Sequence, residues 1–107
     1  MAITNFRDLI AWQKSYEVSL SVYKLTQRFP KEELFNLVSQ MRRAAVSVCS
    51  NIAEGFGRNS LKEKDQFYAI AKGSLTEIEC QLEIARGVNI VDEDLFNRTM
   101  DQIMEAQ

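Results

Sequence analysis

The stretch "YAIAKGSLTEIECQLEIA", Tyr68 to Ala85, decides the fold class. Apolar side chains recur in it at alternating intervals of three and four residues, which is typical of an α-helix that packs along one seam against other helices. Ser60 and Glu63, a few residues earlier, form the capping-box pattern that opens a helix. The sequence therefore predicts a long helix from Ser60 to about Gly87, whose seam consists of Tyr68, Ala71, Leu75, Ile78, Leu82 and Ala85.

A second long helix is predicted between Pro30 and Gly57. Pro30 ends the preceding helix, because the residue before a proline is pushed out of the α conformation. Apolar residues then recur with a helical period, and Gly55 or Gly57 is expected to end the helix in the left-handed conformation that glycine adopts without a Cβ penalty. The predicted seam of this helix consists of Leu34, Val38, Met41, Ala45, Val48 and Ile52.

The first predicted helix runs from Asn5 or Phe6 to about Arg28, with Asn5 as its cap. It has two apolar stripes, whereas a helix of a monomeric bundle needs only one. One stripe consists of Leu9, Trp12, Tyr16, Leu20 and Tyr23. The other is covered either by the loop after Pro30 or by a second subunit, and we favour a subunit contact for at least part of it. This predicted oligomer contact consists of Ala11, Val18, Val22, Leu25 and Phe29.

Asp92 is the predicted cap of a fourth helix that stops at Gln107 and contributes Leu95, Met100, Ile103 and Met104. A single proline, four glycines and the lack of alternating β-branched runs leave little room for a sheet. Short connections favour antiparallel neighbours. We therefore predict that residues 1–107 form one all-α domain, an up-down-up-down antiparallel four-helix bundle with a short fourth helix. The alternative is a three-helix core whose fourth segment docks on another chain.

The residue inventory argues against an enzyme. The chain has no histidine, which excludes Ser-His-Asp and Cys-His catalysis and the mixed Glu/His di-metal sites of helical bundles. Glu77, Glu79 and Glu83 share one helix, but its rotation turns them apart, so we interpret them as a solvated acidic face rather than a metal site. The Gly55–Gly57 segment follows a helix rather than a strand and does not predict a phosphate loop. We expect no catalytic residue, metal, cofactor or small-molecule substrate.

Location and charge are also constrained. No segment approaches the ~20 consecutive apolar residues of a membrane span, and the N-terminus lacks a signal-peptide pattern, so we expect a cytoplasmic protein. Cys49 and Cys80 are too far apart for a CxxC motif, and we expect both to be small buried residues in a reducing compartment. Residues 1–58 have eight Lys/Arg and five Asp/Glu, whereas residues 59–107 have five and ten. Any site for a polyanion is therefore expected in the first half.

The helix after Pro30 also has a polar stripe opposite its seam. Arg43, Ser47, Asn51 and Glu54 follow one another at i, i+4, i+8 and i+11, so they share a face. Three interpretations stay open: a solvated face, a packed interface in which Arg43 and Glu54 pair across subunits, and an arginine patch that binds phosphates. The candidate residues for an interface or for nucleic-acid binding are Arg42, Arg43, Ser47, Asn51, Glu54 and Arg58, with Lys14 or Lys24 as neighbouring cations.

Four stretches together resemble a known family: "FRDLIAWQKS" (6–15), "VYKLTQRFPKEE" (22–33), "SQMRRAAVSVCSNIAEGFGR" (39–58) and "GSLTEIECQLEIA" (73–85). In this order and spacing they resemble the bacterial four-helix-bundle proteins named for the intervening sequences of 23S ribosomal RNA genes. The resemblance implies a ring-like homopentamer. A related branch, the accessory proteins of diversity-generating retroelements, implies RNA or DNA and a reverse transcriptase as partners.

Two departures from the family pattern bear on these implications. Cys49 stands where the family usually has proline, so we expect a less kinked helix. The family tends to extend the fourth helix beyond Gln107, so this is either a short member or a truncated one. The retroelement branch is basic, whereas this chain has a net charge of −2. We therefore predict a non-enzymatic homo-oligomer, a pentamer by resemblance, with an RNA- or DNA-binding module as the alternative.

Overall fold

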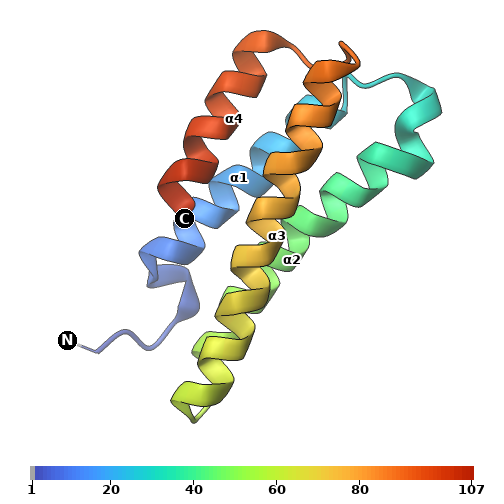
Figure 1. Ribbon diagram of the computed structural model, residues 1–107. Helices are drawn as coiled ribbons and strands as arrows, with labels where there is room; N and C mark the ends of the chain where they lie inside the picture. The colour runs from blue at the N-terminus through green and yellow to red at the C-terminus, as the bar shows by residue number, and fades with distance from the viewer. Residues whose placement is uncertain (1) are drawn as a thin grey trace.

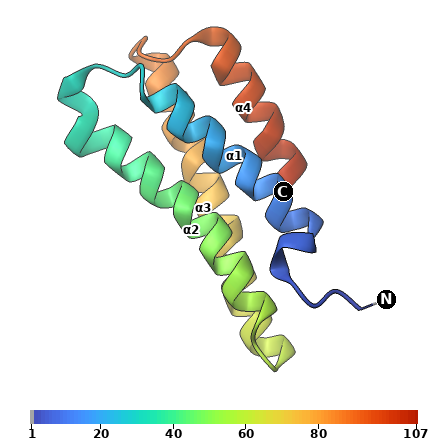
Figure 2. The same ribbon diagram turned by 180° about the vertical axis from the view of Figure 1, so that it is seen from behind.

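Four α-helices, arranged in two layers, make up most of the chain (Figures 1 and 2). The structure is a computed structural model that describes residues 2–107. No strand occurs in this range, which confirms the all-α prediction. The elements in chain order are the short helix η1 (Phe6–Asp8), α1 (Ile10–Thr26), η2 (Lys31–Glu33), the π-helical turn η3 (Leu34–Val38), α2 (Ser39–Phe56), α3 (Leu61–Gly87) and α4 (Glu93–Ala106).

The four helices run up, down, up and down, as predicted. Figure 1 shows α3 and α4 in front of α1 and α2, and Figure 2 shows the same two layers from behind. Helices α2 and α3 form the longest hairpin, which extends past the end of α4. Helix α4 packs against its own chain, since Phe96 and Ile103 are buried and Ser21 of α1 donates a 2.6 Å hydrogen bond to Gln102. The alternative of a fourth segment docked on another chain is therefore wrong.

Two predicted helix caps are confirmed. The Ser60 hydroxyl accepts a hydrogen bond from the backbone N–H of Glu63 at 3.1 Å, which opens α3. The Asp92 carboxylate accepts one from the N–H of Leu95 at 3.0 Å, which opens α4. Each cap satisfies an N–H group that has no partner within its helix. Local sequence therefore sets where α3 and α4 begin.

The first helix begins later than predicted. Asn5 does act as a cap, because its side chain accepts a hydrogen bond from the N–H of Arg7 at 2.9 Å, but it caps only the single turn η1. Leu9 then adopts an extended conformation (φ −72°, ψ 128°), and α1 starts at Ile10. The extended residue separates η1 from α1, so the prediction of one continuous helix from Asn5 or Phe6 was wrong.

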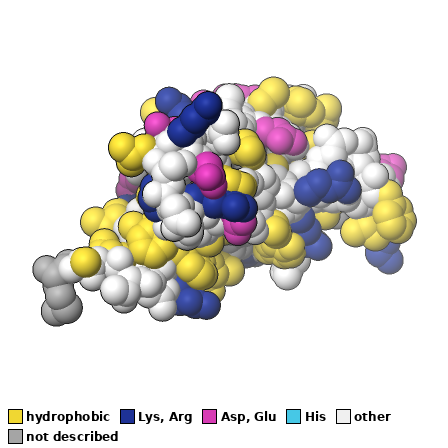
Figure 3. Space-filling view, turned by 90° about the horizontal axis from the view of Figure 1, so that it is seen from below, with side chains coloured by type: hydrophobic (Ala, Val, Ile, Leu, Met, Phe, Trp, Pro, Cys, Tyr) yellow, Lys and Arg dark blue, Asp and Glu magenta, His cyan; other side chains and the backbone are white. Residues whose placement is uncertain are grey.

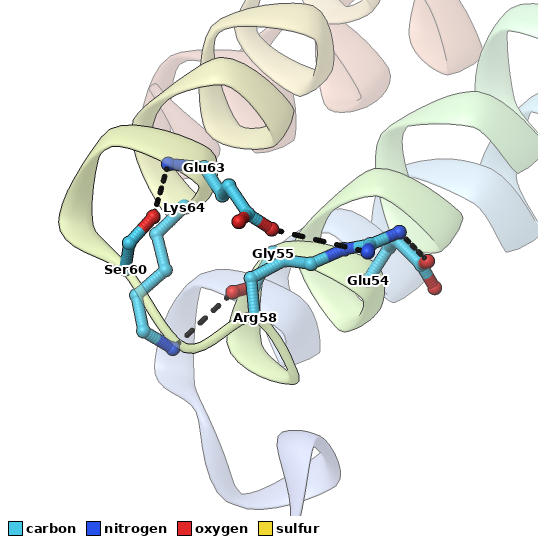
Figure 4. A network of polar contacts seen from close by, with 6 residues as sticks. All are labelled: Glu54, Gly55, Arg58, Ser60, Glu63 and Lys64. Carbon is cyan, nitrogen blue, oxygen red and sulfur yellow. Dashed lines mark hydrogen bonds and ion pairs between the residues drawn. The ribbon is translucent and has the colours of Figure 1, made fainter.

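The second helix ends without a left-handed glycine, contrary to the prediction. No glycine of residues 2–107 has a positive φ, and Gly57 has φ −80°. Instead, the ammonium group of Lys64 donates a 3.2 Å hydrogen bond to the carbonyl oxygen of Gly55 (Figure 4). It donates a second one, at 2.6 Å, to the carbonyl oxygen of Phe56. A cation there also opposes the negative end of the helix dipole. Within residues 2–107, the one residue with a positive φ is Asn89, which follows α3.

Gly55 has a packing role instead. A Cβ atom placed on it would lie 2.7 Å from Cε1 of Tyr68 and 3.1 Å from Cβ of Phe67. Both residues belong to α3, so the missing side chain allows α2 and α3 to approach closely near their connection. The small residue is therefore needed by the hairpin itself.

The core confirms most of the predicted seams. All α3 seam residues after Tyr68 are buried, and Tyr68 is half-buried near the connection between α2 and α3. The α2 seam is buried from Val38 onwards, whereas Leu34, the first residue of η3, is exposed. In α4, the predicted Ile103 is buried but Met104 is exposed, and Phe96, which was not predicted, is buried as well.

Candidate interaction surface

The clearest exposed apolar feature is one face of α1. Tyr16, Leu20 and Tyr23 follow at i, i+4 and i+7, so they share a face, and their exposed fractions are 46%, 53% and 40%. Trp12, one turn earlier, stacks on Tyr16 with ring centroids 5.0 Å apart and planes 12° from parallel. We call Trp12, Tyr16, Leu20 and Tyr23 the aromatic stripe. Its stacked rings present a preformed apolar surface to solvent.

The stripe of α1 that was predicted to contact another subunit faces the core, and the other stripe faces solvent. The residues predicted to contact another subunit, Val18, Val22, Leu25 and Phe29, are buried in the core of their own chain. They cannot reach a second chain, so this prediction was wrong, and only Ala11 of the set is exposed. This arrangement has a physical reason: the aliphatic side chains fill the core, whereas tyrosine rings leave their hydroxyl ends in water.

The centre of the predicted polar stripe on α2 packs against α3. The Ser74 hydroxyl donates a 2.9 Å hydrogen bond to the hydroxyl of Ser47. The Asn51 amide donates to the carbonyl oxygen and to the hydroxyl of Ser47, at 2.8 and 3.0 Å. Ser47 therefore ties α2 to α3 within one chain, and Asn51 supports it from within α2.

The two ends of the polar stripe behave differently. Glu54 forms an ion pair with Arg58, one turn later, and Arg58 also approaches Glu63 at 3.9 Å (Figure 4). The guanidinium of Arg58 lies over the ring of Phe67, 4.8 Å from its centroid. Arg43 is exposed and forms no ion pair within residues 2–107. The four residues therefore do not form one surface, and Glu54 already has a partner in its own chain.

Arg42 joins the aromatic stripe to α2. Its Nε donates a 3.0 Å hydrogen bond to the hydroxyl of the buried Thr26, and its guanidinium lies 4.8 Å from the ring centroid of Tyr23. The side chain of Arg42 is half-buried. Lys24 is exposed near the same end of the stripe. Neither cation forms an ion pair within the described part of the chain, so both leave positive charge beside the rings.

Lys14 is engaged within the fold. Its ammonium group lies 2.9 Å from the carboxylate of Glu105, which ties α1 to α4. The hydrogen bond to this carboxylate, together with its negative charge, raises the pKa of Lys14 above the ordinary lysine value. Lys14 and Arg58 are thus neutralised within the chain, which removes two of the cations that the sequence offered for nucleic-acid binding.

The two cysteines differ from each other. Cys49 is half-buried, with its Sγ 3.3 Å from the hydroxyl of Ser19, and burial raises the pKa of its thiol. Cys80 is exposed on α3, so the prediction that both are buried was wrong. Both thiols are free.

A comparison with known families agrees with this geometry. A family model described as 23S rRNA-intervening sequence protein matches residues 7–107, which is nearly the whole chain. The chain belongs to the 23S rRNA-intervening sequence protein family. This confirms the resemblance inferred from the four sequence stretches. Comparison with curated proteins gives no match.

This 23S rRNA-intervening sequence protein has a second exposed seam, which the sequence analysis did not single out. On α3, Ile70, Gly73, Glu77, Cys80 and Ile84 follow at intervals of three, four, three and four residues, and all five are exposed. The exposed fractions of Ile70 and Ile84 are 51% and 52%. We call these five residues the outer seam. Their spacing repeats that of the buried seam, so the sequence did contain the signal.

Three hollows lie on the surface of this family member, one of them, of about 280 Å³, between the end of α1 and α2 with Phe29, Val38 and Arg42 in its lining. Another, of about 320 Å³, lies where α4 ends, and its mostly apolar lining includes Ile52, Leu75 and Ala106, with Lys72 as its one cation. The third, of about 170 Å³, lies beside the outer seam and is lined by Thr76, Glu79, Cys80 and Glu83. Figure 3 shows hydrophobic side chains reaching the surface between charges of both signs. Among residues 2–107, no cluster of three or more acidic or cysteine side chains is arranged to hold a metal, and no helix is long and apolar enough to cross a membrane.

Proposed function

We propose that this protein is a non-enzymatic structural subunit that assembles with copies of itself, as a homopentamer, through the aromatic stripe of α1. The observation that carries the proposal is the exposure of Tyr16, Leu20 and Tyr23 on one face. The number five comes from the family resemblance. The non-enzymatic role rests on the residue inventory, since the chain has no histidine and its polar residues on α2 support packing within the chain.

The stripe has the composition of a protein interface. Tyrosine, tryptophan and arginine are enriched in the residues that contribute most binding energy. The aromatic rings bury a large area with few rotatable bonds, and the arginine guanidinium stacks on rings and donates several hydrogen bonds. Burying the remaining exposed half of each of the three side chains contributes about 1 kcal/mol apiece. Arg42, held over Tyr23, extends the surface onto α2 and keeps a cation at its edge. These residues need little reorganisation to bind, which lowers the entropic cost of association.

A single charge in the stripe tests the proposal. Leu20→Glu places a carboxylate among the rings, while its exposed position leaves the core of the chain unchanged. Met104→Glu is the matched control, because Met104 is an exposed apolar residue on α4, outside the stripe, with 61% of its surface accessible. Sedimentation velocity should show a wild-type mass near 62 kDa, five times the 12.3 kDa chain, and a monomeric Leu20→Glu variant. Met104→Glu should keep the wild-type mass.

Two results would contradict the proposal: a Leu20→Glu variant that keeps the wild-type mass, or a wild-type protein that sediments as a 12.3 kDa monomer at every concentration. Circular dichroism of each variant shows whether it is folded.

A second candidate function, nucleic-acid binding, is supported by cations at the junction of α1 and α2. Lys24 and Arg43 are exposed without an ion pair in residues 2–107, and Arg28 and Lys31 are exposed nearby in the chain. Lysine and arginine side chains displace counterions from phosphates, so binding through them weakens as salt increases. An electrophoretic shift assay with structured RNA at two salt concentrations tests this function. Saturable, salt-sensitive binding that Arg43→Ala reduces would support nucleic-acid binding, and no binding at low salt would contradict it.

A further inference from the structure

Helix α3 presents a complete packing seam to solvent. Its buried seam faces the core, while the outer seam is displaced around the helix and has the same alternating spacing of three and four residues. This spacing positions side chains to interlock with a second helix. Two isoleucines, Ile70 and Ile84, flank smaller residues at its centre, and the chain itself covers neither of them fully. The outer seam thus has the pattern of a helix contact without a helix on it.

Gly73 gives an independent reason to expect a close neighbour. It lies in the interior of the 27-residue helix α3, where glycine destabilises the helix relative to alanine. A Cβ atom added to Gly73 meets no heavy atom within 4 Å, in contrast to Gly55, where the chain itself fills the space. Packing within one chain therefore gives no reason for a glycine at this position. A close approach by the backbone of another chain does give a reason for a glycine here.

Charge indicates which surface fits the outer seam. Glu77 lies in the middle of the seam and forms no ion pair within residues 2–107, and the adjoining hollow adds the carboxylate of Glu79; Glu83, in the same hollow, already pairs with Arg86 at 4.0 Å. The aromatic stripe has the opposite charge at its edge, from Lys24 and Arg42. The aromatic stripe belongs to the half of the chain with a net positive charge (residues 1–58), and the outer seam belongs to the half with a net negative charge (residues 59–107). Apolar residues with opposite charges around them favour contact between the two surfaces.

We propose that the outer seam of α3 binds the aromatic stripe of α1 from the next copy of the chain, so that each copy uses two different faces. The inference rests on the proposed self-assembly and specifies its geometry. A contact between unlike faces is heterologous, and it forms a closed ring when the rotation between copies closes. Both faces adjoin α2: Tyr23 lies under Arg42 on one side, and Ser74, next to Gly73, bonds to Ser47 on the other.

A mixing experiment with two blocked variants tests this pairing. Leu20→Glu blocks the aromatic stripe and leaves the outer seam free, whereas Ile84→Glu blocks the outer seam and leaves the stripe free. We expect each variant alone to be monomeric and a 1:1 mixture to form a complex of twice the chain mass, because one free stripe meets one free seam. Met104→Glu, outside both faces, should keep the wild-type mass. Light scattering coupled to size exclusion measures all four samples.

The outcomes separate this inference from the proposed function. If Ile84→Glu keeps the wild-type mass while Leu20→Glu is monomeric, self-assembly stands and the pairing with α3 is wrong. A mixture that stays monomeric also overturns the pairing, and a monomeric wild type overturns both proposals. The reaction rate of the Cys80 thiol tests the pairing without introducing a charge into the outer seam. The thiol should react with a maleimide at least tenfold more slowly in the assembled wild type than in Leu20→Glu, and equal rates would contradict the inference.

Discussion

Replacing Gly73 with alanine separates the stability of the single chain from the stability of its assembly. A Cβ at this position has no heavy atom within 4 Å, so in a monomer the substitution changes only the helix propensity. Alanine is favoured over glycine in a helix interior by about 0.8–1.0 kcal/mol. For a chain of this length, 1 kcal/mol raises Tm by about 4–8 °C. In the monomeric Leu20→Glu background, Gly73→Ala should therefore increase the free energy of unfolding by about 1 kcal/mol.

The same methyl group should weaken the assembly. If the outer seam packs against the next copy, the added carbon enters a filled contact, and overpacking destabilises by about 1–3 kcal/mol. This corresponds to a roughly 5- to 150-fold increase in the dissociation constant of each contact. Urea unfolding measures the monomer, and sedimentation equilibrium with and without Gly73→Ala in the wild type measures the assembly. An assembly as tight as the wild type would refute a packed seam. A destabilised monomer would refute the open space around Gly73.

Three further experiments probe the chain itself. Gly55→Ala should destabilise the fold by about 1–3 kcal/mol in urea unfolding, because the new Cβ would collide with α3, whereas Gly57→Ala, whose Cβ would make only ordinary contacts, should have little effect. Asn89→Val should destabilise by about 1–2 kcal/mol, because φ is 60° there and a β-branched residue is strained in that region; an unchanged Tm would count against that backbone. In a Cys80→Ser protein, the rate–pH profile of Cys49 with a maleimide should lie at higher pH than in the urea-unfolded chain, since burial raises its pKa, and coincident profiles would contradict this.

The sequence predicted the parts of the fold that local chemistry determines. The caps at Ser60 and Asp92 follow from side chains that accept hydrogen bonds from nearby backbone N–H groups, and the structure confirms both; α3 also ends at Gly87, as predicted. The end of α2 was mispredicted because its carbonyls bind Lys64, a residue on the next helix. A contact of that kind depends on the tertiary fold and cannot be inferred from a glycine motif.

The candidate surface was only partly predictable. Periodicity showed that α1 has one apolar stripe too many, but it could not say which stripe faces inward, since both have the same helical period. The structure decides this by burying Val18 and Val22 and exposing Tyr16 and Leu20. The polar stripe of α2 failed as a single site for a related reason. Its spacing placed the residues on one face, but the partner at Ser74 belongs to a helix whose position the sequence did not give.

The central claim is that this family member assembles through the aromatic stripe of α1. Sedimentation equilibrium of the wild-type protein beside Leu20→Glu, over a hundredfold range of concentration, tests it most directly. The account predicts a wild-type mass near 62 kDa, five chains of 12.3 kDa, and a folded Leu20→Glu variant at the mass of one chain. A wild-type protein at 12.3 kDa throughout, or equal masses for the two proteins, would contradict it.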